Sequence, residues 1–249
     1  MNADQIELIG VMGGGVMGGG IAQSCVVAGF NVRVRDLADE LNEKTRKTMV
    51  EGRFGLQGAV ERGKLTQEQV DAALARLSFT TKIEELRDAD LIIEAVPEDL
   101  DMKRKVFAEL DGVIKPEAVF ASNTSGFSIA DLSQAVSRKD RFAGMHWFSP
   151  AFLMKLIEII HGPDTSEETI QLLEQVGAAM SKETIRVKDT NDAYGFVANR
   201  IYFAAVAEAR KVLDEEIATV DDINKAMRFG FNWPAGPLEM IAGARKGWQ

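Results

Sequence analysis

A glycine-rich run near the start of the chain has the spacing of a phosphate-binding turn. The run fits G-x-G-x-x-G in one register, with Gly13, Gly15 and Gly18. We expect Gly13 to permit a tight turn, Gly15 to let a pyrophosphate approach the backbone, and Gly18 to let the following helix pack closely. Asp36 follows 23 positions after Gly13 and is placed to hold ribose hydroxyls. These residues predict a dinucleotide site; the alternative is a glycine-rich loop without function.

The chain has two histidines, and one of them is a candidate general base. His146 lies near the end of an apolar run at 142–148, and a second run at 156–160 follows after a short connection. A connection this short allows antiparallel pairing but no helical crossover, and a hairpin centred on Phe152 would place His146 opposite Glu158. The carboxylate would fix the tautomer of the imidazole, as an oriented base requires. The alternative is a structural His–Glu pair, and His161 is interpreted as a solvated residue at a strand end.

The surrounding sequence alternates between strand and helix patterns. Val32 and Val34 alternate with charged residues before Asp36, which indicates a strand that ends at the acid. Ligands bind at the carboxyl ends of strands in open α/β sheets, so this placement agrees with a dinucleotide site. Strands are predicted at 6–11, 32–35, 78–81, 91–96, 118–121, 142–148, 156–160 and 184–188, and helices at 101–112, 128–136, 166–181, 196–214 and 221–229. The pattern predicts an α/β fold with a doubly wound, mostly parallel sheet and one antiparallel hairpin.

Two domains are predicted from the change in this pattern. Residues 1–190 form the α/β domain, and they include an inserted helical hairpin at about 38–77. Residues 189–195 are polar and rich in turn formers, which marks a boundary. Residues 191–249 form a small helical C-terminal domain.

The composition argues against several classes of protein. A net charge of −9 disfavours nucleic acid as a partner, because surfaces that follow phosphates need an excess of Lys and Arg. The chain starts without a basic region and has no run of about 18 apolar residues, so we expect no membrane association and a cytoplasmic location. Cys25 is the single cysteine and is interpreted as a small buried hydrophobe. No metal site is predicted.

Six ordered motifs along nearly the whole chain resemble those of the L-3-hydroxyacyl-CoA dehydrogenase family. They are GGGVMGGGIA at 13–22, EAVPE at 94–98, ASNTS at 121–125, GMHWFSP at 144–150, MKLIE at 154–158 and GFVANR at 195–200. The resemblance implies a Rossmann-type NAD-binding domain and a helical C-terminal domain that serves substrate binding and homodimer formation. It also implies oxidation of a 3-hydroxyacyl-CoA, such as 3-hydroxybutyryl-CoA, to the 3-ketoacyl-CoA with NAD.

The same resemblance implies roles for four residues around the reacting group. His146 resembles the family's base, which accepts the 3-hydroxyl proton as the hydride leaves, and Glu158 resembles its orienting partner. Ser125 matches the serine that hydrogen-bonds the reacting oxygen, and Asn199 matches the fourth polar residue of the active site. From their positions alone, Ser125 would be a turn residue after a strand and Asn199 a hydrogen-bonding residue at a helix start.

Contacts with NAD are implied as well. Glu98 and Lys103 match positions near the nicotinamide, although Lys103 by itself is equally typical of a solvated helix charge. Pro97 is expected to end its strand so that the backbone turns under the cofactor. Asp36 favours NAD over NADP, since its carboxylate repels a 2′-phosphate. Arg33 and Arg35 lie close to it in sequence and oppose this preference. The predicted cofactor residues are Gly13, Gly15, Val16, Met17, Gly18, Asp36, Val96, Pro97, Glu98, Lys103 and Asn123.

Three features depart from the family's pattern. Ser149 stands where many members carry asparagine, and the approach to Gly195 is longer than usual and lacks a proline. The sequence ends at Gln249, where relatives continue for further helices, so the C-terminal domain is predicted to be truncated. Two other functions fit the same residues: a dehydrogenase of a free substrate such as gulonate or carnitine, and a catalytically impaired NAD-binding protein. Met154-Lys155-Leu156 favours the CoA enzymes.

Overall fold

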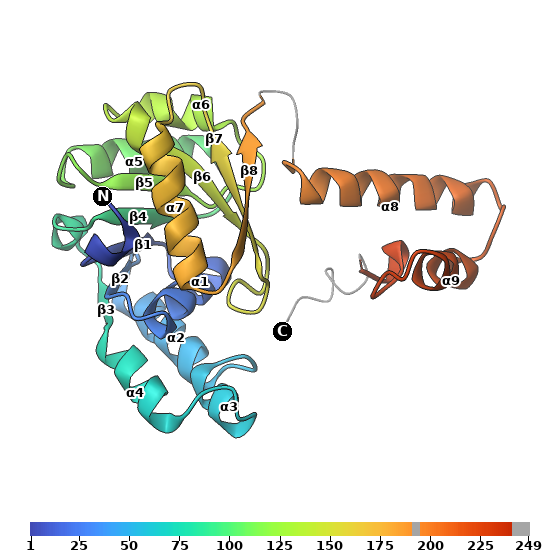
Figure 1. The fold of residues 1–249 in the computed structure, drawn as a ribbon, viewed down its shortest axis with the longest axis horizontal. Coiled ribbons are helices and arrows are strands. Elements are labelled where there is room, and N and C mark those ends of the chain that lie inside the picture. Colours follow the sequence, from blue (N-terminus) through green and yellow to red (C-terminus); the bar gives the residue numbers. More distant parts are fainter. Residues whose placement is uncertain (191–194, 241–249) are drawn as a thin grey trace. The chain divides into compact units, whose positions relative to one another are not determined.

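The computed structural model describes residues 1–190 and 195–240 and divides the chain into two compact units, Met1–Asp192 and Ala193–Gln249 (Figure 1). The first unit contains a sheet with flanking helices, and the described part of the second is helical. The boundary predicted at 189–195 lies partly outside the described residues, as does the end of the chain from 241.

One sheet forms the centre of the first unit. Its strands are Ile9–Met12 (β1), Val32–Arg35 (β2), Leu77–Thr80 (β3), Leu91–Glu94 (β4), Val119–Ser122 (β5), Phe142–Trp147 (β6), Leu156–His161 (β7) and Glu183–Lys188 (β8). Within the described residues the order is β3-β2-β1-β4-β5-β6-β7-β8. The neighbouring strands are parallel except for β6 and β7, which are antiparallel. The predicted mostly parallel sheet with an antiparallel hairpin is confirmed.

Helices cover both faces of this sheet (Figure 1). In the first unit they are Val16–Val27 (α1), Asp39–Glu51 (α2), Leu56–Glu61 (α3), Gln67–Ala75 (α4), Leu100–Asp111 (α5), Ile129–Leu132 (α6) and Glu167–Ala179 (α7), with short 3-10 turns at Ala3–Gln5, Ile83–Leu86, Ser133–Ala135 and Lys139–Arg141. On one face, Ile21 of α1 and Leu173 of α7 share a core with sheet residues. On the other, Phe107 of α5 contacts Phe120 and Phe142, at ring-centroid distances of 6.0 and 4.7 Å. Coverage of both faces explains why the central strands are apolar throughout.

The insertion between β2 and β3 contains three helices, α2 to α4, where the sequence predicted a hairpin. The additional break lies between α2 and α3. A Cβ on Gly55 would lie 2.5 Å from the carbonyl oxygen of Val50, so this turn closes only around a glycine. The predicted break at 62–64 is present, and Thr66 then caps α4 by accepting a hydrogen bond from the backbone N–H of Gln69 (3.2 Å).

Strands β6 and β7 pair in the predicted register. His146 lies directly opposite Glu158, and Met145 lies opposite Ile159. Because side chains alternate between faces along a strand, this register puts His146 and Glu158 on the same face of the sheet. The predicted pairing of the two residues is confirmed.

The described part of the second unit contains Ala198–Asp214 (α8) and Val220–Gly230 (α9). Thr219 caps α9 by accepting from the backbone N–H of Asp222 (3.2 Å). The side chain of Asn224 accepts from the N–H of Leu238 (3.1 Å) and so ties the following loop to α9. None of the described helices is both long enough and apolar enough to cross a membrane.

Candidate functional site

The glycine-rich turn joins β1 to α1, and two of its glycines are required by the protein's own packing. Gly13 has a φ of +89°, and a Cβ there would lie 2.9 Å from the carbonyl oxygen of Ala95. A Cβ on Gly18 would overlap the carbonyl oxygen of Gly13. Both glycines therefore let the chain turn tightly and let α1 pass close to the turn.

Gly15 has no such internal reason to be a glycine. Among the described residues, nothing lies within 4 Å of the position that its Cβ would occupy. Gly15 is exposed and is the N-cap of α1, and the next residue, Val16, is 79% exposed. A helix N-terminus offers backbone N–H donors and partial positive charge. The open space and these donors fit a pyrophosphate that approaches the backbone at Gly15.

Asp36 lies just after β2 and contacts the glycine-rich turn. Its Oδ2 accepts from the N–H of Gly14 (2.7 Å), and its Oδ1 accepts from the N–H of Leu37 (2.7 Å). The hydroxyl of Thr45 also contacts the turn and donates to the carbonyl oxygen of Gly14 (2.7 Å). The half-buried carboxylate of Asp36 is therefore held beside the turn, where the ribose of a bound dinucleotide would lie.

Lys103 is buried in an ion-pair network, which excludes the interpretation as a solvated charge. Its Nζ lies 2.7 Å from Oε1 of Glu94 and 3.2 Å from Oε2 of Glu98. Glu94 is fully buried at the end of β4, and its other oxygen accepts from the Ser122 hydroxyl (2.6 Å). Burial raises the pKa of Glu94, and the Lys103 ammonium and the hydrogen bonds from Ser122 and Val96 oppose that rise.

Glu98 extends this network to Ser125. Its Oε1 accepts from the hydroxyl of Thr124 (2.6 Å) and from the backbone N–H of Ser125 (2.8 Å). Beside them, Oδ1 of Asn123 accepts from the backbone N–H of Trp147 (2.9 Å), so the segment after β5 is tied to the end of β6. The network therefore orders the backbone at Ser125, and Asn123 ties the same segment to Trp147, the residue after His146.

His146 and Glu158 form a buried pair on adjacent strands. Nδ1 of His146 lies 2.7 Å from Oε2 of Glu158, and the side chains are 3% and 0% exposed. A carboxylate that is ionised can only accept hydrogen bonds, so with an ionised Glu158 the shared proton belongs to Nδ1 of His146. In the neutral ring the lone pair is then on Nε2, as proton abstraction requires.

The sheet brings most predicted site residues to one edge. Gly13, Asp36, Glu98 and Asn123 follow the carboxyl ends of the adjacent parallel strands β1, β2, β4 and β5. Of the remaining predicted cofactor residues, Met17 packs against the core, Val96 is half-buried and Pro97 is exposed. Asn199 belongs to the second unit, where it lies in the first turn of α8. Within the described part of the chain, no group of three or more His, Cys, Asp or Glu side chains is arranged to hold a metal ion.

Sequence reasoning missed three polar residues that support this edge. Glu94 ends an otherwise apolar strand, and an acid in such a run was an available signal. Ser122 and Thr45 carried no comparable signal. Their partners, Glu94 and Gly14, are 28 and 31 residues away, so the contacts depend on the tertiary fold.

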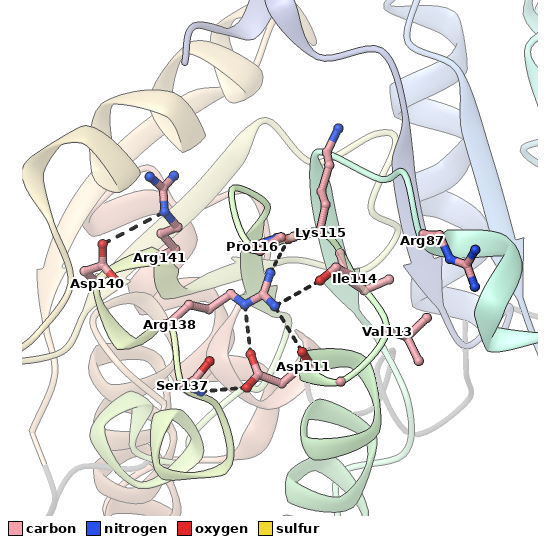
Figure 2. A pocket seen from close by; sticks show the side chains of 11 residues that line it. Arg87, Asp111, Val113, Ile114, Lys115, Pro116, Ser137, Arg138, Asp140 and Arg141 are labelled. Carbon is pink, nitrogen blue, oxygen red and sulfur yellow. Dashed lines mark hydrogen bonds and ion pairs between the residues drawn. The ribbon is translucent and has the colours of Figure 1, made fainter.

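A separate polar cavity of about 550 Å³ lies at the other edge of the sheet (Figure 2). The Nε of Arg138 donates to Asp111 (2.8 Å), and Nη2 donates to the carbonyl oxygen of Ile114 (3.0 Å). Lys115, also at this cavity, pairs with Asp90 (2.6 Å). These residues precede β4, β5 and β6, whereas the predicted site residues follow strands. The cavity is therefore distinct from the dinucleotide turn.

The chain matches two parts of one protein family. Residues 8–190 match the NAD binding domain of 3-hydroxyacyl-CoA dehydrogenase, and residues 195–244 match the C-terminal domain of 3-hydroxyacyl-CoA dehydrogenase. Together the two matches cover almost all of the chain.

Individual relatives agree with this match. The 3-hydroxybutyryl-CoA dehydrogenase of Bradyrhizobium diazoefficiens is 38% identical over 94% of this chain and 78% of its own length. The mitochondrial hydroxyacyl-coenzyme A dehydrogenase of Rattus norvegicus is 35% identical over 95% of this chain and 75% of its own length. The crystal structure of (S)-3-hydroxybutyryl-CoA dehydrogenase from Ralstonia eutropha has a TM-score of 0.89 and 38% identity, covering 95% of this chain and 81% of that one. The chain therefore belongs to the 3-hydroxyacyl-CoA dehydrogenase family, and residues 8–190 are its NAD-binding domain.

Proposed function

We propose that this protein is an NAD-dependent 3-hydroxyacyl-CoA dehydrogenase, which transfers a hydride between NAD and C3 of a short 3-hydroxyacyl-CoA. The observation that carries the proposal is the buried His146–Glu158 pair on strands of the sheet that also carries the open Gly15 turn. Relatives at 38% identity are named 3-hydroxybutyryl-CoA dehydrogenase, which supports this substrate class.

In this mechanism His146 is the general base. In the oxidation direction, Nε2 of His146 takes the proton of the 3-hydroxyl group, and the C3–O bond becomes a carbonyl. Bound NAD supplies the acceptor for the hydride that leaves C3. Glu158 holds the tautomer and stabilises the imidazolium that forms. In the reverse direction the same imidazolium returns the proton to the oxygen.

Ser125 and Asn199 complete the proposed site. Ser125 would hydrogen-bond the reacting oxygen, and its backbone is held by Glu98 through the contact at 2.8 Å. Asn199 would supply a further polar contact from the second unit, where Gly195, at a φ of +91°, precedes α8 and accepts from the N–H of Arg200 (3.1 Å).

The assay that tests this function follows NADH oxidation with acetoacetyl-CoA. We expect turnover with this substrate and much slower turnover with free acetoacetate. Intact NADH binding without turnover of acetoacetyl-CoA would contradict the proposal and indicate a catalytically impaired NAD-binding protein.

A dehydrogenase of a free substrate uses the same hydride chemistry without CoA. The structure of a diketoreductase that acts on dicarbonyl compounds has a TM-score of 0.85 and 27% identity to this chain, and this similarity motivates the alternative. Turnover of a free hydroxy acid or of carnitine above that of acetoacetyl-CoA would favour this alternative.

We also propose that Asp36 selects NAD over NADP. A carboxylate beside the ribose repels a 2′-phosphate. The two arginines that could offset it are engaged elsewhere: Arg35 donates to the carbonyl oxygen of Thr81 (3.2 Å), and Arg33 donates to that of Glu85. We expect NADH to be preferred over NADPH by about tenfold or more in kcat/KM, equivalent to at least about 1.4 kcal/mol.

Homodimer formation through the C-terminal helices is part of the proposal. Ile201 on α8 is 65% exposed, and Phe229 and Phe231 at the end of α9 are 79% and 74% exposed. Exposed apolar side chains gathered on a small helical unit are typical of a surface that associates with another protein. Sedimentation equilibrium would measure the mass of the assembly.

We propose a cytoplasmic location for the protein. Cys25 is the single cysteine and is buried, so the fold is built without a disulfide. Burial raises the pKa of its thiol to about 12, which keeps it unreactive. Cell fractionation with an antibody against the protein would test the location.

A further inference from the structure

Lys182 lies in the turn between α7 and β8, and only 8% of it is exposed. The end of α7 sets its backbone: the N–H of Lys182 donates to the carbonyl oxygen of Gly177 (3.0 Å), and that of Ser181 donates to Ala178 (2.9 Å). Ser181 has a φ of 56°, so this is a Schellman helix end with serine where glycine is usual. The turn therefore has a defined conformation from which the Lys182 side chain projects.

The ammonium group of Lys182 binds three carbonyl oxygens of one loop. Its Nζ lies 2.7 Å from the oxygen of Ala151, 3.2 Å from that of Phe152 and 2.7 Å from that of Met154. Three acceptors match the three N–H donors of an ammonium group. It also lies 5.6 Å from the centroid of the Trp147 ring, within the range of a cation–π contact. One buried ammonium group thus binds three backbone carbonyl groups of the same loop.

Keeping this charge buried has a cost. Burial lowers the pKa of Lys182 to about 8, so the folded protein binds the proton less tightly than an exposed lysine would. An apolar side chain would fill the same space without that cost. The charged group is therefore better explained by what it holds in place than by core packing.

The loop that Lys182 binds connects β6 to β7 and touches two other elements. A Cβ on Gly20 of α1 would lie 3.1 Å from the Cβ of Ala151, so this loop packs directly on the helix that begins at the glycine turn. The ring of Phe152 lies 5.9 Å from that of Phe54, in the connection between α2 and α3. The loop is therefore the point where the hairpin meets both α1 and the helical insertion.

We propose that Lys182 is a positioning residue for catalysis: it clamps the β6–β7 loop against α1 and so fixes the His146–Glu158 pair relative to the dinucleotide turn. The inference rests on the proposed function. The ladder between β6 and β7 does not include Lys182, so its loss leaves the strands paired while it loosens their connection. Small displacements of a catalytic base cost rate more than they cost cofactor binding.

The test compares Lys182→Met, which keeps the length of the side chain but removes the charge, with Lys182→Arg, which keeps a cation. Lys188→Met is the matched control, because Lys188 is an exposed lysine on β8. For Lys182→Met we expect kcat with acetoacetyl-CoA to fall about tenfold to hundredfold, while the Kd of NADH stays within about threefold. Lys182→Arg should recover part of the rate, and the control should match the wild type.

Amide hydrogen exchange in residues 148–155 provides a readout that does not depend on turnover. We expect faster exchange there in Lys182→Met than in the wild type or the control. Unchanged exchange, or an unchanged kcat in a variant that has lost only thermal stability, would overturn the inference. Lys182→Gln gives the same comparison if Lys182→Met does not fold. A wild type that binds NADH but does not act on acetoacetyl-CoA would refute the proposed function, and the exchange measurement would still decide on the clamp.

Discussion

Glu158 is fully buried, and its Oε2 lies 2.7 Å from Nδ1 of His146. Because the carboxylate can only accept, it holds the proton of His146 on Nδ1. A buried carboxylate is costly unless it is well paired, so its position on the central part of β7 is informative in itself. At the scale of single residues, this pair and the open space at Gly15 are features that packing alone does not explain.

Replacement of His146 tests the assignment of the base. We expect His146→Ala to lower kcat by about 10²-fold to 10⁴-fold, because general base catalysis contributes that much, while NADH affinity hardly changes. Steady-state kinetics and NADH fluorescence titration measure the two effects. His161→Ala is the control, since His161 ends β7 and is not assigned to the reaction. An unchanged rate in His146→Ala would remove His146 from the mechanism.

Replacement of Gly15 tests the pyrophosphate site. Gly15→Val adds a side chain where the described protein leaves space, so the fold should persist while NADH binding weakens by about tenfold or more, or about 1.4 kcal/mol. Gly230→Val is matched to it, because a Cβ on Gly230 also meets nothing within 4 Å among the described residues. Equal NADH affinities of the two variants would argue against a pyrophosphate at Gly15.

At the scale of elements, Asp90 joins the starts of three strands. Its Oδ2 accepts from the N–H groups of Glu7 (2.7 Å) and Leu8 (3.1 Å), ahead of β1, and its Oδ1 pairs with Lys115 (2.6 Å), ahead of β5. Burial by itself would raise the pKa of Asp90, but these hydrogen bonds and the Lys115 charge outweigh it and hold the pKa below its ordinary value. The ionised carboxylate therefore stabilises the edge of the sheet opposite the dinucleotide turn.

Asp90→Asn should destabilise the protein in a pH-dependent way. Because the pKa of Asp90 is lower in the folded than in the unfolded chain, its stabilisation is complete above about pH 4 to 5 and is lost as the pH falls through the folded value. We expect a deficit of about 1 to 3 kcal/mol at pH 7 that shrinks towards pH 3, measured by urea unfolding. Asp88 is an exposed neighbour of Asp90, so the control variant Asp88→Asn should show no such deficit. A deficit that stays constant down to pH 3 would contradict this account.

At the scale of the whole molecule, the chain is divided into two units of different architecture. The first unit carries the predicted NAD, base and serine positions at one edge of its sheet, and α8 and α9 of the second unit carry exposed apolar side chains. Apolar surface of this kind is costly in water and is covered when a partner binds. Assembly is therefore a property of the second unit in this proposal.

A charge on the surface of α8 tests the proposed dimer. We expect Ile201→Asp to shift the protein from dimer to monomer in sedimentation equilibrium, because a carboxylate would be buried unpaired in an apolar interface. Arg210→Asp places the same residue at another exposed position of α8 and should leave the mass unchanged. A monomeric wild type, or a dimeric Ile201→Asp variant, would contradict assembly through α8.

The local sequence pattern was sufficient to predict the features that depend on residues close together in the chain. The glycine spacing at 13–18 predicted the turn, because backbone freedom is a property of each residue. The pairing of His146 with Glu158 also followed from the sequence, since a hairpin centred on Phe152 places position 146 opposite position 158.

Contacts between distant polar side chains were decided only by the tertiary structure. Lys103 could equally have been solvated until the fold placed it on Glu94 and Glu98, and Lys182 contacts Ala151 across 31 residues. The extra break at Gly55 was missed although its cause, a close approach to Val50, is local in the chain. Hydrophobic periodicity predicts which face of an element is buried, but not which buried polar groups contact one another there. Those contacts depend on how the elements pack in the tertiary structure.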